Sequence, residues 1–313
     1  MKSNWEHSHT GVFTRDFDKT LHYYKSLGLA PELGPRQRPP RAPGDKFVNI
    51  EFGQPVDNYV DPSKPFLELL YIGDLEFEVL HAPAERPEGE ALAYGEGVNH
   101  VCFNVPDIDG ETDLLVKKGF RIIQDAKLND VRIEDYLDTR ELGNILLSLR
   151  PPQTEEVKAK KAGYGVVRWT YLGVGAVVRD VEKTVKYYQS TGIATFQRQS
   201  TFDSKSVKDI MVYGKSIKDV IRAKTRLMRI GPVTYELIQP VEGEAIYKES
   251  LDRRGEGVIN LTFAVGDLDR ETRKLAEKGV PVVFSGKPQT GNAFAYLDTR
   301  PDGGDVMIKL VQS

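Results

Sequence analysis

The chain of 313 residues contains a single cysteine, Cys102, and lacks any long apolar run. One cysteine excludes a disulfide within the chain and is typical of a reducing compartment such as the cytoplasm. No apolar stretch approaches the roughly 20 residues that a membrane-spanning helix needs, and the N-terminal sequence MKSNWEHSH has no apolar signal region. We therefore predict a cytoplasmic protein that does not contact a membrane.

The chain also lacks a strong charge of either sign. Its 43 Lys and Arg residues and 46 Asp and Glu residues give a formal net charge of -3. A surface that binds nucleic acid needs clustered positive charge, and this composition gives no sign of it. We therefore predict a small molecule as the partner, with no nucleic acid, and expect a monomer or a homodimer.

One unit recurs four times along the chain. In each copy a strand-like apolar run ends at an Asp, and a Gly follows that Asp after twelve positions. Asp accepts hydrogen bonds from the unpaired amides of a first helical turn, and Gly adopts the left-handed backbone that ends a helix. Each pair therefore predicts one helix with its two ends. The pairs are Asp16/Gly28, Asp107/Gly119, Asp180/Gly192 and Asp267/Gly279.

Strand-like runs joined by short turns follow the helices, such as KFVNIEF, PFLELLYIG and LEFEVLHAP after the first. A strand, a helix and three further strands form a βαβββ module, so we predict four modules in an α+β fold. The two halves are homologous, since GEGVNHVCFNVPDID is matched by GEGVINLTFAVGDLD. We predict domains at residues 1–152 and 166–313, joined by a polar linker at 153–165 that lacks apolar periodicity.

Only the first two copies place a histidine seven residues before the capping Asp. These residues are His9 and His100, whereas the third and fourth copies have Gly173 and Asn260. This asymmetry indicates that any chemistry lies in the first half. Cys102 follows on the same strand as His100, and we predict a small apolar packing role for it.

These features resemble the vicinal oxygen chelate superfamily. The segments HTGVFTRDFDKTLHYYKSLGL and HVCFNVPD carry its pattern of strand, capping Asp and amphipathic helix, and FEVL and YELIQP resemble the last strand of a module. The resemblance implies that the four modules form two tandem, cup-shaped mixed-sheet domains. It leaves the activity open, because the superfamily includes glyoxalases, epimerases, extradiol dioxygenases, fosfomycin-modifying enzymes and metal-free antibiotic-binding proteins.

In the metal-using members, ligands come from the first and last strands of each module. The resemblance therefore implies His9, Glu78 and His100 as the metal ligands of the first domain. Two imidazoles and one carboxylate suit Fe, Mn, Co, Ni or Zn, and three ligands leave positions for water or substrate. The alternative is that these residues are ordinary buried or solvent-facing side chains.

The fourth ligand position of the first domain falls on Ser148, where many members have Glu. The matching positions of the second domain are Gly173, Glu236, Asn260 and Lys309. Because Lys309 would place an ammonium group where a cation must lie, we predict no metal there. We expect an ion pair between Glu236 and Lys309, and a structural role for the second domain.

Proton transfer needs a base close to the substrate. In related epimerases and glyoxalases this base is commonly the carboxylate at the Ser148 position, and a serine cannot replace it. We therefore consider Glu134, Tyr136 and Glu76 as catalytic candidates, and expect Ser148 to contact the substrate.

The segment 31–46, PELGPRQRPPRAPGDK, places Arg36, Arg38 and Arg41 among prolines. Prolines hold such a segment extended and stiff. We predict that these arginines cover the cup and bind a carboxylate or phosphate of the substrate. A solvated loop without function is the alternative.

The leading functional prediction is a divalent-metal-dependent isomerase, epimerase or lyase that acts on a small oxygenated metabolite through a metal-stabilised enolate. The segments YLDTRELGN and YLDTRPDGG resemble the methylmalonyl-CoA epimerase-like branch and favour this prediction. Two His and one Glu are also the ligand set of non-haem Fe(II) oxygenases, so an extradiol ring-cleaving dioxygenase is the first alternative. A metal-free small-molecule-binding protein of the resistance type is the second.

Overall fold

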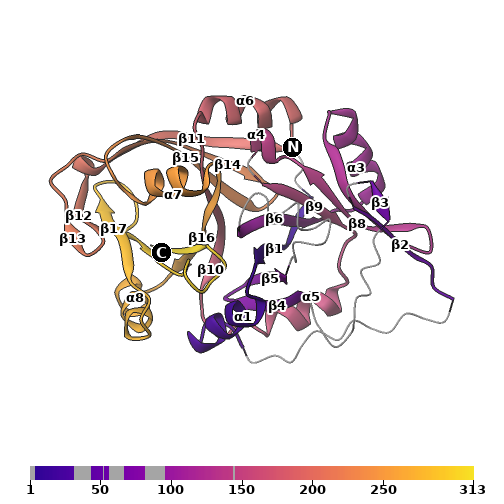
Figure 1. The fold of residues 1–313 in the computed structure, drawn as a ribbon, viewed down its shortest axis with the longest axis horizontal. Helices are drawn as coiled ribbons and strands as arrows, with labels where there is room; N and C mark the ends of the chain where they lie inside the picture. The colour runs from indigo at the N-terminus through magenta and orange to yellow at the C-terminus, as the bar shows by residue number, and fades with distance from the viewer. Residues whose placement is uncertain (1–3, 32–43, 52, 56–66, 82–95, 144) are drawn as a thin grey trace.

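The computed structural model describes residues 4–31, 44–51, 53–55, 67–81, 96–143 and 145–313. Within these residues the chain forms two mixed sheets, one of nine strands from the first half and one of ten strands from the second (Figure 1). Few helices accompany them, so the α+β prediction is confirmed. No helix in these parts of the chain is long and apolar enough to cross a membrane.

The first half contributes the first sheet and four described helices. Its strands are β1 (Glu6–Thr14), β2 (Phe47–Glu51), β3 (Gln54–Pro55), β4 (Leu67–Ile72), β5 (Leu75–His81), β6 (Gly97–Asn104), β7 (Arg121–Leu128), β8 (Val131–Asp138) and β9 (Leu146–Arg150). Its helices are α1 (Phe17–Ser26), α3 (Ile108–Lys117), α4 (Arg140–Gly143) and α5 (Glu155–Ala162).

The second half contributes the second sheet. Its strands are β10 (Thr170–Val177), β11 (Ala194–Asp203), β12 (Val207–Val212), β13 (Lys215–Ser216), β14 (Arg222–Ile230), β15 (Val233–Glu242), β16 (Gly257–Val265), β17 (Val282–Pro288), β18 (Phe294–Leu297) and β19 (Met307–Gln312). Its helices are α6 (Val181–Thr191), the 3-10 helix η1 (Ser204–Ser206), α7 (Ile246–Arg254) and α8 (Leu268–Glu277).

The two sheets share one topology. The first has the order β3-β2-β7-β8-β9-β6-β1-β5-β4, and the second has β11-β14-β15-β10-β16-β19-β18-β17-β12-β13. In every module the last strand lies parallel to the first, as β5 does on β1 and β9 on β6. The first strands of two modules pair antiparallel, β1 with β6 and β10 with β16. Modules therefore pair within each half.

The four predicted helices begin and end where the Asp/Gly pairs predict. Each of the four capping Asp side chains accepts a hydrogen bond from the backbone N–H three residues later, at 2.9 to 3.1 Å. The four glycines have φ angles between 68° and 94°. A side chain in that left-handed region is strained, so glycine is required where these helices end.

Several elements go beyond the predicted pattern. In module three the second strand of the module is β11, which pairs with β14, whereas the β12–β13 hairpin pairs with β17 of module four. The corresponding stretch of the first half lies outside the described residues. Helix α5 lies in the predicted linker, and helix α7 precedes module four. The basic βαβββ plan of each module remains.

The helix-covered faces of both sheets share one apolar core. Its fully buried members include Phe77 and Phe103 from the first half and Phe263 and Leu310 from the second. Burial of apolar surface is the main stabilising term in folding. The opposite faces of the sheets, which form the concave sides of the two cups, are separate from this core.

Hydrogen bonds also join the halves. The Tyr24 hydroxyl, on α1, donates to the carbonyl oxygen of Gly303 in module four at 2.9 Å. The Lys278 ammonium, just after α8, donates to the carbonyl oxygen of Ser26 at 3.0 Å. Tyr24 is fully buried, so no water can replace its partner.

We predict that Tyr24→Phe lowers the free energy of unfolding by about 1 kcal/mol, because the Gly303 carbonyl loses its buried donor. Urea denaturation would measure the change. Tyr23→Phe, at the neighbouring half-buried tyrosine, is the matched control. Equal stability of Tyr24→Phe and the wild type would show that this hydrogen bond does not stabilise the protein.

Candidate metal centre

Three adjacent strands of the first sheet bring His9, Glu78 and His100 together. His9 lies on β1, Glu78 on β5 and His100 on β6, and the register places Gly11 of β1 opposite both Glu78 and His100. The Nε2 atoms of the two histidines are 3.0 Å apart, and each is 3.4 Å from Glu78 Oε2. All three side chains are fully buried.

This geometry fits a divalent metal ion. Neighbouring ligands of one ion, each about 2.1 Å from it, lie about 3 Å apart. Among the described residues, neither oxygen of Glu78 has a partner in hydrogen-bond geometry. A buried carboxylate without such partners is costly unless a cation compensates it. The other ring nitrogen of each histidine has its own hydrogen-bond partner. His9 Nδ1 lies 3.2 Å from Ser8 Oγ, and His100 Nδ1 lies 3.1 Å from Asn99 Oδ1.

The pKa values of the three side chains are strongly shifted. Burial opposes a charge on His9, but Cys102 and Glu78 raise the pKa of His9 to about 10. Burial opposes the ionisation of Glu78, yet His9 and His100 hold the pKa of Glu78 well below its usual range. Burial lowers the pKa of His100. In the protein alone, a protonated His9 thus compensates Glu78, and a divalent ion would supply that charge instead.

Gly11 makes room for the His100 ring. A Cβ atom at this position would lie 2.0 Å from Cε1 of His100, so any other residue would displace the imidazole. Gly175 occupies the same place in the second half, where a Cβ atom would lie 2.2 Å from Oδ1 of Asn260. In both halves the paired strands therefore require a glycine at this position, Gly11 in the first and Gly175 in the second.

A cross-strand row of side chains extends from the metal centre across the inner face of the sheet. Directly paired residues point to the same face. The row consists of His9, Cys102, Ser148, Tyr136, Gln124 and Glu51, in order from β1 to β2. Two catalytic or substrate-binding candidates, Tyr136 and Ser148, thus lie beside the metal ligands. Cys102 lies between His9 and Ser148 in this row. The predicted apolar packing role did not take these polar neighbours into account.

Glu134 reaches the place of the missing fourth carboxylate from the neighbouring strand β8. Ser148 Oγ donates to Glu134 Oε1 at 3.0 Å, and Arg150 Nη2 donates to Oε2 at 2.6 Å. His9, Cys102 and Glu134 each offer one ligand-type atom, and these atoms lie within 4.8 Å of one another. Arg150 was not among the predicted site residues. Its position two residues after Ser148, and so on the same strand face, was the available signal.

Tyr136 contacts the metal centre directly. Its Oη lies 3.2 Å from His100 Nε2, and the two ring centroids are 4.8 Å apart. Burial raises the pKa of Tyr136 well above its ordinary value, and the charges of Glu134 and Glu78 add to this shift. The Tyr136 hydroxyl therefore stays protonated at neutral pH and can donate a hydrogen bond.

The other candidates lie elsewhere. Glu76 is buried on β5, where it forms an ion pair with Lys161 of α5 and accepts a hydrogen bond from Tyr71 Oη at 3.4 Å. Its carboxylate belongs to neither group of converging ligand atoms found among the described residues. Arg36, Arg38 and Arg41 lie outside the described residues.

The second cup keeps a glutamate, Glu236, at the Glu78 position and differs at the other three ligand positions. Glu236 forms the expected ion pair with Lys309, so that prediction is confirmed. Asn260 is fully buried and donates to Thr262 Oγ1 at 2.9 Å. At Gly173, φ is 144° and a Cβ atom would lie 1.8 Å from the carbonyl oxygen of Thr234. A histidine cannot be accommodated there without a change in the backbone.

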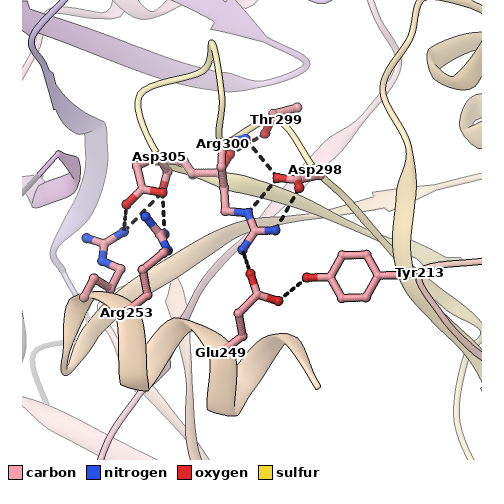
Figure 2. Close-up of polar contacts among 9 residues, drawn as sticks. Tyr213, Glu249, Arg253, Asp298, Thr299, Arg300 and Asp305 are labelled. Atoms are coloured by element: carbon pink, nitrogen blue, oxygen red, sulfur yellow. Dashed lines mark hydrogen bonds and ion pairs between the residues drawn. The ribbon is translucent and has the colours of Figure 1, made fainter. Parts of the chain in front are cut away.

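A cavity of about 850 Å³ lies away from the metal centre. It is lined by Arg15 and Glu96 of the first half and by charged residues of the second half, including Glu249 and Arg300. Arg300 is bound to Asp298 and Glu249 in a network of ion pairs (Figure 2). One guanidinium thus binds two carboxylates.

The sequence matches the glyoxalase/bleomycin resistance protein/dioxygenase superfamily over residues 8–133 and 173–296, and the chain belongs to this family. Among solved structures, a mutant of 4-hydroxymandelate synthase from Streptomyces coelicolor matches with a TM-score of 0.67 and 14% identity, covering 100% of this chain and 93% of that one. At this identity the match shows the shared two-domain fold alone.

A methylmalonyl-CoA epimerase from Mycobacterium tuberculosis matches with 20% identity and a TM-score of 0.36, covering 46% of this chain and 87% of that one. This similarity is too low to bear on function. No curated protein matches the chain in sequence.

We predict that Gly11→Ala weakens metal binding about 10- to 100-fold, the effect typical of removing a group that orients a ligand, because the new methyl group displaces His100. Metal titration would measure the change. Gly175→Ala creates the same clash in the second cup and is the matched control for stability. Equal metal affinity of the two variants would contradict the prediction.

Proposed function

We propose that the protein is a divalent-metal-dependent enzyme whose metal is held by His9, Glu78 and His100. One observation carries this proposal: three fully buried ligand groups from three strands converge, and the Glu78 oxygens lack hydrogen-bond partners among the described residues. Membership of the superfamily supports it, because many members use such a metal. Fe, Mn, Co, Ni and Zn all suit this ligand set.

The proposed reaction is an isomerisation, epimerisation or lyase step on a small metabolite with two adjacent oxygen atoms. A divalent metal in this position would act as a Lewis acid toward such oxygens. Glu134 is the proposed proton acceptor, since Ser148 and Arg150 hold its carboxylate beside His9. Tyr136 is the proposed donor, because its hydroxyl lies at the metal centre, 3.2 Å from His100 Nε2.

An Fe(II)-dependent dioxygenase is the second candidate. Two imidazoles and one carboxylate that converge from one side form the ligand set of non-haem Fe(II) oxygenases. The approach of all three groups from neighbouring strands of one sheet is the observation that favours this candidate. Oxygen consumption would separate it from the leading proposal, which needs no oxygen.

We predict that His100→Ala loses its metal, because two ligands retain a divalent ion far less well than three. Elemental analysis after purification without chelators would measure the metal content. Asn260→Ala, at the equivalent position of the second cup, should keep the metal content of the wild type. Metal-free wild-type protein, or His100→Ala with undiminished metal, would refute the assigned centre.

We predict that Glu134→Gln lowers kcat by about 10²- to 10⁴-fold, the usual contribution of a positioned acid or base, while the metal content stays unchanged. Loss of deuterium exchange from solvent into the substrate would accompany this change. Undiminished turnover with normal exchange would rule out Glu134 as the base. Turnover that consumes oxygen without exchange would favour the dioxygenase.

A further inference from the structure

An additional residue in β1 lies beside the metal ligand His9. In the pairing of β1 with β6, His7 lies opposite Phe103 and His9 lies opposite Cys102. Ser8 between them has no partner on β6 and forms a β-bulge. Successive side chains of a regular strand point to opposite faces, and a bulge interrupts this alternation. Ser8 can therefore direct its hydroxyl to the neighbouring imidazole, and its Oγ lies 3.2 Å from His9 Nδ1.

The second half has the same bulge without a hydroxyl. Leu172 is the additional residue of β10, between Tyr171 and Gly173 of the paired register. Ser8 is buried, with 7% of its surface exposed, whereas Leu172 is 38% exposed. The bulge is therefore a feature of the fold. The buried hydroxyl accompanies the histidine, since the position after Leu172 is a glycine.

Ser8 is itself held by the interdomain linker. The side-chain amide of Gln153, a half-buried residue, donates from Nε2 to Ser8 Oγ at 3.3 Å. Two prolines precede Gln153 directly after β9, and they restrict the backbone there. Thr154 follows and caps α5, because its Oγ1 accepts from the Val157 N–H at 3.3 Å. The position of the Gln153 amide is thus fixed from both sides.

The rest of the linker lies against the strands of the metal ligands. The Lys158 ammonium of α5 is 2.8 Å from Glu6 Oε2 on β1. Lys161 of α5 forms an ion pair with Glu76 on β5. Glu76 lies two residues before Glu78, so the two side chains point to the same face of the sheet. The linker therefore contacts both β1 and β5 close to their ligands.

The hydrogen bonds of Ser8 bear on metal binding through the His9 ring. His9 would bind a metal through Nε2, the ring nitrogen that faces Glu78 and His100. Metal binding requires that Nε2 carries no proton, so the proton of the neutral ring lies on Nδ1 and needs an acceptor. A serine hydroxyl rotates easily and can donate as well as accept. The hydrogen bond from Gln153 restricts this rotation, because it holds Oγ between the amide and the imidazole.

We propose that Ser8 and Gln153 are positioning residues of the metal centre, through which the interdomain linker holds His9 in its metal-binding orientation. This inference rests on the proposed function in one respect, the assignment of His9 as a ligand. Neither residue touches the ion. Ser8 acts through His9, and Gln153 acts through Ser8. The metal affinity of the first cup thus depends on the path that the chain takes between its two domains.

Titration of the full-length protein with Zn²⁺ and Co²⁺ would test this proposal. We expect Ser8→Ala to weaken binding of both metals about 10- to 100-fold, the usual effect of removing a group that orients a ligand. Gln153→Ala should weaken binding in the same direction. In the Ser8→Ala background it should change nothing further, because residues that act in series are not additive. Ser8→Thr, which keeps the hydroxyl, should bind metal as the wild type does.

Two variants in the second half are the matched controls. Leu172→Ala changes the equivalent bulge residue. Gln239→Ala removes a half-buried glutamine whose Oε1 accepts from the Val181 N–H at 3.1 Å. Both should keep the metal affinity of the wild type. Urea denaturation of the metal-free variants measures their stability, and the Ser8→Thr and Gln153→Ala variants decide the test if Ser8→Ala is destabilised.

A second measurement needs no metal. In metal-free protein, NMR should show the His9 Nδ1–H resonance, because a proton held by Ser8 exchanges slowly with water. Ser8→Ala should lose this resonance, and Leu172→Ala should keep it. Unchanged metal affinity and an unchanged resonance in Ser8→Ala would overturn the proposal, as would additive effects of Ser8→Ala and Gln153→Ala. Metal binding that is insensitive to both residues refutes this inference alone. A wild type that binds no metal but shows the expected NMR changes refutes the proposed function alone.

Discussion

The antiparallel pairing of β1 with β6 is the interaction on which the candidate site depends. It sets the first strands of two modules side by side and places Gly11 opposite His100. A shift of this register by one residue would turn every inward side chain to the opposite face of the sheet. The two imidazoles meet at 3.0 Å because the register is fixed and Gly11 leaves space for the ring. The carboxylate of Glu78 then joins them through the parallel pairing of β5 with β1.

Features encoded by a few neighbouring residues were predictable from the sequence. The capping Asp residues and the terminal glycines act within one helical turn, so their spacing alone predicts the four helices. The repeated position of His9 and His100 is also visible in the sequence. The convergence of these residues with Glu78 was implied by the family resemblance, and the structure brings the three groups together.

Features that depend on pairing between distant strands could not be predicted in the same way. The role of Ser148 as a donor to Glu134, and the contact of Arg150 with the same carboxylate, depend on the register of β8 with β9. Helix α7 has no sequence signal at its start, because Ala245 precedes it and provides no side-chain cap. Strand β11 was missed because its residues, ATFQRQSTFD, mix polar and apolar types without a long apolar run.

The two cups compensate the same buried carboxylate in different ways. In the second cup the ammonium of Lys309 lies against Glu236, and that cation is covalently part of the chain. In the first cup the equivalent Glu78 faces two imidazoles, and its charge is compensated by a proton on His9 or, in our proposal, by a metal ion. Lys309 compensates Glu236 without any bound ion, and it occupies the space that an ion would need. In our proposal the first cup uses an exchangeable cation at the equivalent place, and such an ion can also bind a substrate.

The apolar core that continues from one sheet to the other makes each half dependent on its neighbour. Either half produced alone would expose a broad aromatic and aliphatic surface and would tend to aggregate. After a duplication, this dependence preserves the second half, because deleting it would expose the apolar interior of the first half. In our proposal the metal centre lies in the first half, so the second half needs no ligand set of its own to be retained in the chain.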